Sequence, residues 1–149
     1  MPEEQVVERA RHDKEEGKSP STQAGEFVRE EMHHIREGMH GVQSPQQAIA
    51  IGLSKARRAG VKLPPPKRGK VSSQTRAQAA RDSRKGRRSK THKPSPARSR
   101  AISKALKRKG RSAASRGSLS RHAKTAARVR GSRSRQRSAR QAARTRAKH

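Results

Sequence analysis

The scarcity of large apolar side chains constrains this chain more than any other feature. Of its 149 residues only 27% are hydrophobic, and a single aromatic residue, Phe27, is present. With a net charge of +29, so little apolar surface cannot offset the conformational entropy that is lost when a whole chain is ordered. The sequence therefore predicts a mostly disordered chain with a small all-α N-terminal part.

Charge divides the chain into two chemically different parts. Residues 1–66 contain ten acidic and ten basic side chains, whereas residues 67–149 contain 30 Lys or Arg and one acid, Asp82. Three consecutive prolines lie at the junction, and their fixed φ values favour a semi-rigid spacer. The predicted organisation is a weak N-terminal helix and linker over residues 1–20, a helical hairpin over 21–63, a proline spacer over 64–66 and a disordered basic tail over 67–149.

Two segments with helical periodicity predict the hairpin. The first runs from about Ser21 to Glu37, and the second begins with Ser44 as N-cap and Pro45 at the first helical position. A Gln three residues after the cap completes a capping box, and Gly60 provides a C-terminal stop. Two amphipathic helices joined by about six residues favour an antiparallel pair. The predicted hairpin core consists of Val28, Met32, Ile35, Ile49 and Leu53.

Weaker helical patterns flank the hairpin. Near the N-terminus only Val6, Val7 and Ala10 are apolar, which indicates a solvated helix that frays. Within the tail, segments at 96–109, about 119–130 and 138–148 are rich in Ala and Arg and carry helix start or stop signals. We expect these tail segments to become helical when phosphates neutralise their charge.

The second helix of the predicted hairpin has a familiar sequence. SPQQAIAIGLSKARRAGVKLPPP, preceded by FVREEMHHIREGMHG, resembles a family of small basic bacterial proteins of unknown function with a recurring QAIAIGLSEARRAGVK-like helix. The resemblance covers about residues 26–66, and Lys55 stands where that pattern often has an acid. It implies a bacterial origin and a genuine helical module, but no activity. In composition, the tail is similar to linker-histone and bacterial histone-like tails.

The residues offer no catalytic arrangement and no cofactor motif. Apart from Asp82, every acid lies within the first 37 residues, so a nucleophile with a base and an orienting group cannot be assembled. Glu30 and His33 form an ExxH pair, but one such motif supplies too few ligands for a metal site. Instead, we expect ion pairs at i, i+4, Glu30 with His34 and His33 with Glu37. The sequence therefore predicts a protein that is not an enzyme and binds neither metal nor cofactor.

Cysteine usage and hydropathy indicate the compartment. The chain has no cysteine, which excludes disulfides and thiolate metal sites and suits a reducing compartment. The sequence contains neither an apolar run of signal-peptide length nor a stretch that could span a bilayer. We therefore expect a cytoplasmic protein, located at the nucleoid if it binds DNA.

The composition of the tail predicts its partner. Arginine outnumbers lysine 20 to 10 between residues 67 and 149, and its planar fork can bind phosphate oxygens in a bidentate manner. No motif for base readout is present, so the predicted function is sequence-nonspecific DNA binding and compaction by a nucleoid-associated or histone-like protein. The predicted contacts are Lys67, Arg68, Lys70, Arg84, Lys85, Arg87, Arg88, Lys90, Arg98, Arg100, Lys104, Lys107, Arg108, Lys109, Arg111, Arg128, Arg130, Arg133, Arg135, Arg137, Arg140, Arg144 and Arg146.

Two alternatives fit the same sequence. An arginine-rich segment can also bind structured RNA, which would make the protein an RNA-binding or ribosome-associated factor. In the other alternative the hairpin is the active part, docking a protein partner or a second copy of the chain while the tail serves as an anchor. Self-association would cover Ile35, Met39, Ile49 and Leu53, which two short helices cannot bury fully.

Overall fold

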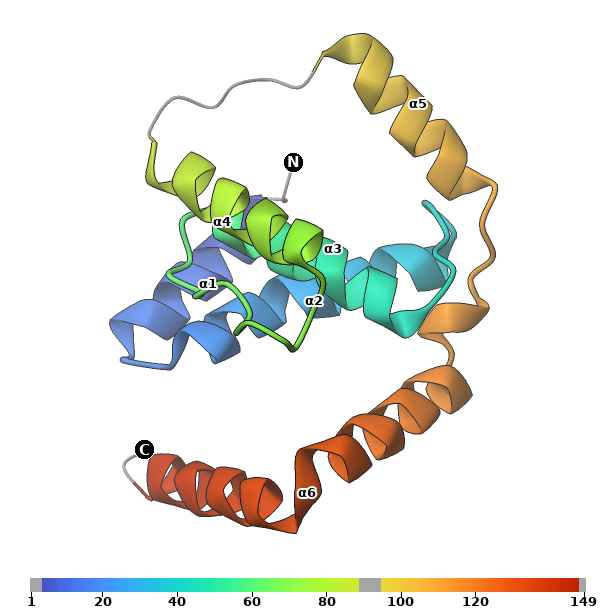
Figure 1. The fold of residues 1–149 in the computed structure, drawn as a ribbon. Coiled ribbons are helices and arrows are strands. Elements are labelled where there is room, and N and C mark those ends of the chain that lie inside the picture. Colours follow the sequence, from blue (N-terminus) through green and yellow to red (C-terminus); the bar gives the residue numbers. More distant parts are fainter. Residues whose placement is uncertain (1–3, 89–94, 148–149) are drawn as a thin grey trace.

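The fold consists almost entirely of helices. The computed structural model describes residues 4–88 and 95–147, and within these ranges it is built from six α-helices and one short 3₁₀ helix (Figure 1). In chain order they are α1 (Glu4–Glu15), α2 (Pro20–Glu37), α3 (Pro45–Arg58), α4 (Ser73–Arg87), α5 (Pro96–Lys107), η1 (Ser112–Ala114) and α6 (Arg116–Arg146). The structure is 76% helical. The prediction of a mostly disordered chain is therefore wrong.

Local sequence explains why the basic tail is helical. Serine N-caps precede its three α-helices, at Ser72, Ser95 and Ser115, and each side chain accepts a hydrogen bond from the backbone N–H three residues later. Such caps stabilise a helix by about 1 kcal/mol, and Ala and Arg are good helix formers. Neither contribution depends on large apolar side chains, so a low content of such side chains does not exclude these helices. The predicted tail segments coincide with α5 and with parts of α6, whereas α4 was not predicted.

The hairpin forms from the signals that predicted it. Ser44 Oγ accepts from the Gln47 N–H at 3.2 Å, while Gln47 Oε1 accepts from the Gln43 N–H at 2.8 Å. At the other end of α3, Gly60 has φ +94° and Val61 N donates to Ala56 O at 3.1 Å, as in a Schellman cap. The end of α2 packs on the start of α3, and the start of α2 on the end of α3, so the pair is antiparallel.

Two apolar clusters occupy the two ends of the hairpin. One contains Met32, Ile35, Val42, Ala48, Ala113 and Ala114, with Val28 and Ile49 packed against it. The other contains Val6, Ala10, Ala24, Phe27 and Ala56, with Leu53 packed against it. The five predicted core residues therefore belong to two clusters, and the hairpin alone completes neither of them. Both include residues from outside the hairpin.

The N-terminal helix closes the second cluster. Val6 of α1 is only 1% exposed, and it packs with Ala10 on the side of α2 that carries Phe27, itself fully buried. The interpretation of this segment as a solvated, fraying helix is therefore wrong. Its weak periodicity concealed a short contact face of one Val and one Ala, which pack in the same cluster as Phe27, the largest fully buried side chain.

The apolar face that was expected to need a second copy is covered largely within the chain. Ile35 is fully buried, and Ile49 and Leu53 are half-buried against the two clusters. Met39 remains 52% exposed. Uncovered apolar surface on the hairpin is therefore no longer an argument for self-association.

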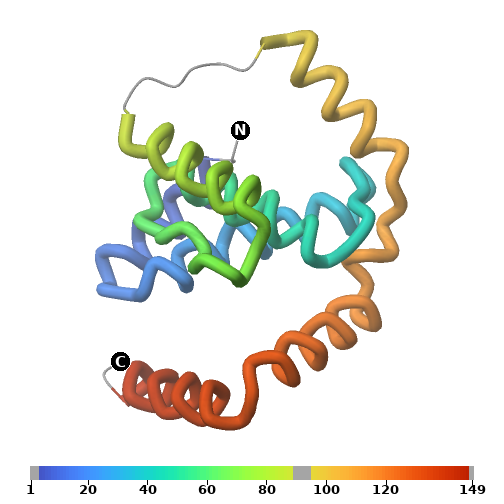
Figure 2. The backbone as a smooth tube through the Cα atoms, viewed as in Figure 1, coloured from blue at the N-terminus to red at the C-terminus, as the bar shows by residue number. Residues whose placement is uncertain are grey.

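The C-terminal helices extend away from a compact group formed by α1 to α4. In Figure 2, α5 and α6 lie on opposite sides of this group. The segment that joins them passes beside the α2–α3 turn. Neither α5 nor α6 contains a buried residue. Among the helices of the described residues, none is both long and apolar enough to cross a membrane.

Close helix packing gives a first testable prediction. A Cβ added to Gly52 of α3 would lie 2.8 Å from Val28 Cα of α2, whereas a Cβ on Gly25 would meet no heavy atom within 4 Å. Gly52→Ala should therefore lower the free energy of unfolding by about 1–2 kcal/mol, because overpacking outweighs the gain in helix propensity. Gly25→Ala, the matched control within α2, should raise it by about 0.5–1 kcal/mol. Urea unfolding would measure both, and equal effects would contradict this packing.

Candidate nucleic-acid interface

The structure leaves the predicted phosphate contacts accessible. Of the 23 Lys and Arg predicted as contacts, Lys90 lies outside the described residues, Lys109 is half-buried and the other 21 are exposed. They lie on α4, α5 and α6, on the segments between these helices and on the segment before α4, which carries Lys67, Arg68 and Lys70. In the described structure they do not gather in one concave site. The candidate interface is therefore a set of cationic helices.

One buried carboxylate anchors α4, the first of these helices. Asp82 is only 1% exposed, accepting hydrogen bonds from Ser54 Oγ at 2.8 Å and from Arg58 Nε at 3.0 Å, both on α3. Gln78 Nε2 donates to the same carboxylate at 3.1 Å. The only acid of the tail thus fixes α4 to α3, and leaves the arginines of α4 on the outer side. Its isolation among 30 basic residues was a signal of this role.

The end of α3 lies very close to α4. A Cβ on Gly86 would collide with Arg57 O, so the backbones can approach this closely only with glycine at that position. The Arg57 side chain is buried, and its Nη2 donates to Pro64 O at 3.3 Å. Burial lowers the pKa of the Arg57 guanidinium, while Asp82 acts in the opposite direction. Arg57 therefore holds the proline segment, and it is not available to phosphate.

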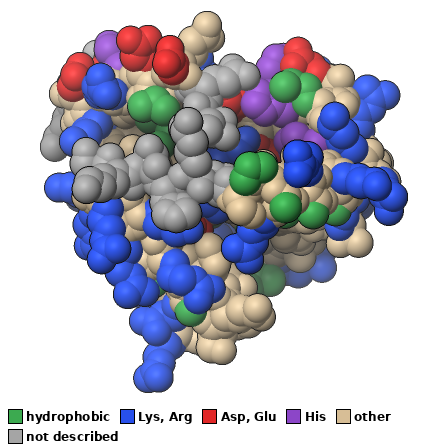
Figure 3. All heavy atoms as spheres, turned by 90° about the horizontal axis from the view of Figure 1, so that it is seen from above, with side chains coloured by type: hydrophobic (Ala, Val, Ile, Leu, Met, Phe, Trp, Pro, Cys, Tyr) green, Lys and Arg blue, Asp and Glu red, His purple; other side chains and the backbone are tan. Residues whose placement is uncertain are grey.

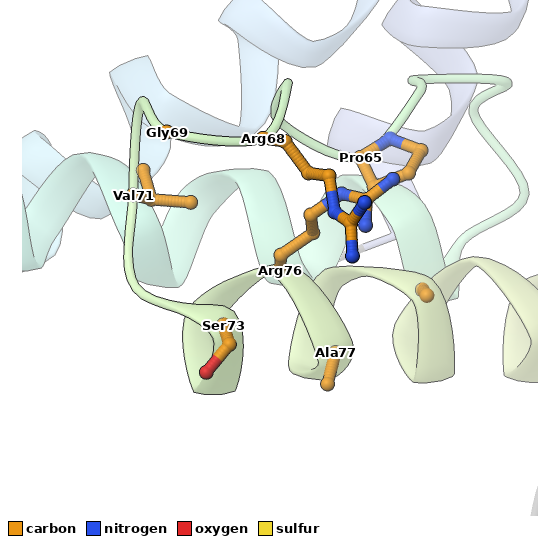
Figure 4. Close-up of a pocket in the computed structure, with 8 residues that line it drawn as sticks. Pro65, Arg68, Gly69, Val71, Ser73, Arg76 and Ala77 are labelled. Atoms are coloured by element: carbon orange, nitrogen blue, oxygen red, sulfur yellow. The ribbon is translucent and has the colours of Figure 1, made fainter.

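A shallow basin lies between the proline segment and α4 (Figure 4). Its volume is about 600 Å³, and Arg68 and Arg76 line it together with Pro65 and Val71. The Arg76 Nε also donates to Pro66 O at 3.2 Å, which holds this side chain beside the loop. Both arginine side chains border this basin in Figure 4, so the basin concentrates positive charge at the start of the tail.

The longest helix, α6, is basic on every side. It carries eleven Lys or Arg and no acid, so basic pairs at i, i+4 such as Arg133 with Arg137 repel each other. Gly131 interrupts it with φ 71° and ψ 165°, a conformation that is essentially limited to glycine. Across this kink the Arg135 Nη1 donates to Ala127 O at 2.7 Å. Two shorter basic helices are thus joined at an angle.

The start of α6 is attached to the hairpin. Ala113 and Ala114 of η1 are buried in the first apolar cluster, with Leu119 packed against them. Arg36 Nε donates to Ala114 O at 3.0 Å, and Arg111 Nη1 donates to Arg36 O at 3.3 Å. Arg111 was predicted as a phosphate contact, and it also contributes to this junction.

Several carboxylates of the described residues form ion pairs within the molecule. Buried carboxylates of residues 1–66 form ion pairs with nearby cations, as in Arg9–Glu26 at 2.9 Å and Lys55–Glu31 at 2.7 Å. The predicted surface pair of His33 with Glu37 is confirmed at 3.0 Å. Within the described ranges, the ion pairs use cations from the first 66 residues. Between residues that the structure describes, no ion pair joins a cation of the tail to a carboxylate. Figure 3 shows Lys and Arg over much of one face.

Sequence reasoning missed several exposed cations of equal standing. They are Arg76 and Arg81 on α4 and Arg116, Arg121 and Lys124 on α6. No feature of the sequence separated them from the predicted contacts, because the tail has nearly uniform composition. Only the orientation of each helix shows which of its cations face solvent.

Comparison with known proteins bears on the hairpin alone. Residues 18–68 match the model of a family of unknown function (DUF6496), which corresponds to 51 of 149 residues, about a third of the chain. The matched range contains α2, α3 and the prolines, and it ends before α4. This agrees with the resemblance of residues 26–66 to a family of unknown function. Neither a curated protein nor a solved structure matches the chain.

Proposed function

We propose that this protein binds DNA through the sugar–phosphate backbone, without preference for base sequence, and compacts it as a nucleoid-associated protein of the cytoplasm. The observation that carries the proposal is the accessibility of the tail cations: 21 of the 22 described predicted contacts are exposed. Because the one acid of the tail, Asp82, is buried and paired with Arg58 of α3, phosphate is the counter-charge that would relieve the mutual repulsion of these cations.

Duplex DNA suits this surface better than single strands do. Proteins that bind single strands stack bases on aromatic side chains, and the only aromatic residue here, Phe27, is fully buried. Cations on all sides of a helix can contact the phosphates of a rod-like duplex. Such contacts position a protein on DNA without reading the edges of the bases.

Compaction requires contact with more than one segment of DNA. In Figure 1, α5 and α6 lie on opposite sides of the group formed by α1 to α4. Four basic side chains on α5 and eleven on α6 would allow each arm to contact its own duplex segment. The hairpin with α1 and α4 would then act as a spacer between the two arms.

Replacing arginine by lysine tests whether the arginines bind phosphate in a bidentate manner. We call Arg133, Arg135, Arg137, Arg140, Arg144 and Arg146, all beyond the Gly131 kink, the distal arginines. Changing all six to Lys retains charge but removes bidentate geometry, so affinity for a 30-base-pair duplex should fall about threefold to tenfold at fixed salt. The dependence of affinity on salt should stay the same. Fluorescence anisotropy measures both quantities.

A parallel titration with duplex RNA of equal length distinguishes the polymers. Tighter binding to RNA than to DNA would contradict the DNA proposal and favour an RNA-associated role. Affinity that is unchanged for both duplexes in the six-lysine variant would show that the distal arginines make no bidentate contacts.

A further inference from the structure

We propose that Glu31, His34 and His40 form a binding site for a divalent transition-metal ion of the zinc class. In the sequence the ExxH pair was a different one, Glu30 with His33, and no metal was predicted. The structure instead brings together one ligand atom from each of Glu31, His34 and His40, all within 4.8 Å of one another. Two imidazoles and one carboxylate form a ligand set that zinc uses when it retains a fourth, open position.

The backbone explains why these three side chains converge. Glu31 and His34 are separated by three residues, so they lie on one face of α2. The helix ends in a left-handed turn at Gly38, where Met39 N donates to His34 O at 3.0 Å. This turn brings His40 back toward the last turns of α2. The two imidazole rings lie edge to face, with 6.4 Å between their centroids.

Buried polar atoms at this place lack hydrogen bonds. The Glu31 side chain is fully buried, and Lys55 Nζ binds its Oε2 at 2.7 Å. His40 Nε2 lies 3.1 Å from the other oxygen, Oε1, yet among the described residues no donor is aligned to form a hydrogen bond with it. His40 Nδ1 is likewise buried without a hydrogen bond to the described residues. A buried carboxylate oxygen without a donor is costly, and a metal ion would satisfy it.

Only a small adjustment would complete the site. With metal–ligand bonds of about 2.0–2.1 Å, tetrahedral ligand atoms lie about 3.3 Å apart, and the three atoms here are already within 4.8 Å. Ligation through Glu31 Oε1 would leave the Lys55 ion pair on Oε2 intact, which would fix the carboxylate as an outer partner often does.

The position of the site suggests what the ion would do. The loop that carries His40 also holds the returning chain, since Gly41 N donates to Leu106 O at 3.0 Å and Val42 N donates to Gly110 O at 3.2 Å. A metal ion on His40 would therefore stiffen the junction between the hairpin and the basic arms. Its expected effect is structural, and it does not depend on the DNA-binding proposal.

Zinc titration of the full chain tests the site. Competition with a chromophoric chelator should show one tight Zn²⁺ per chain, and Co²⁺ should give the visible absorption of a tetrahedral site. His34→Gln and His40→Gln should each weaken Zn²⁺ binding at least about tenfold, and the amide introduced by His40→Gln keeps a polar group near Glu31. The control is His33→Gln, because His33 is exposed and pairs with Glu37. This variant should bind Zn²⁺ as tightly as the unchanged protein does.

Two further readouts separate a specific site from scattered histidines. Zn²⁺ should raise the Tm of the unchanged protein and of the His33→Gln variant, but not that of the His40→Gln variant. It should also slow amide exchange at Gly41 and Val42. Equal affinity in all three variants, or a loss in His33→Gln as large as in His40→Gln, would overturn the proposal.

Discussion

Replacing the six distal arginines by glutamine should lower the affinity for duplex DNA by about two to three orders of magnitude at 0.1 M salt. Each phosphate contact contributes about 0.9 to the log–log salt slope, and at this salt concentration a factor of about eight in affinity. If about three of the six make contact at one time, the slope falls by about 2.7 and the affinity by about 500-fold. Fluorescence anisotropy across a salt series measures both.

This substitution should leave the fold unchanged. The distal arginines lie on a helix without buried residues, and Gln is nearly as good a helix former as Arg. Circular dichroism and Tm should match the unchanged protein. The six-lysine variant is the matched control for charge, because it should retain the full slope. A glutamine variant that binds DNA as tightly as the lysine variant would show that the distal arginines do not contact phosphate.

Asp82→Ala should lower the free energy of unfolding by about 2–3 kcal/mol, because it removes charge-assisted hydrogen bonds from Ser54, Arg58 and Gln78. The loss should concentrate in α4. Its amides should exchange faster, while those of α2 should change little. Removing this acid also adds one unit of positive charge, so the affinity for DNA should not fall.

An exposed carboxylate provides the control for this prediction. Glu37 pairs with His33 at the surface, and exposed pairs contribute about 0–1 kcal/mol, so Glu37→Gln should have little effect on stability. If amides of α4 exchange as slowly in Asp82→Ala as in the unchanged protein, Asp82 does not hold α4 on α3.

The hairpin could be predicted because its signals are local. Ser44, Pro45 and Gly60 define the ends of α3 through contacts with residues only a few positions away. The same kind of signal was present in the tail, at Ser72, Ser95 and Ser115, but the count of large apolar residues outweighed it. Local capping was thus a better guide to helices here than global composition.

The tertiary anchors could not be predicted from periodicity. Ala113 and Ala114 are small, and they are buried only because the chain returns to the hairpin after α5. The site at Glu31 depends in the same way on a loop residue, His40, folding back onto α2. Contacts between segments far apart in the sequence, or across a turn, can be predicted only when the path of the chain is known. By contrast, exposure of the tail cations follows from composition, since few apolar residues are available to cover them.

The dependence of DNA binding on salt tests the central proposal most directly. The full chain would be titrated with an A·T-rich and a G·C-rich duplex of equal length between about 0.05 and 0.4 M salt. If about eight of the tail cations contact phosphate, both plots of log K against log salt should fall along parallel lines with a slope near −7. A slope shallower than about −2, or one duplex preferred about 100-fold at the highest salt, would contradict recognition of the phosphate backbone.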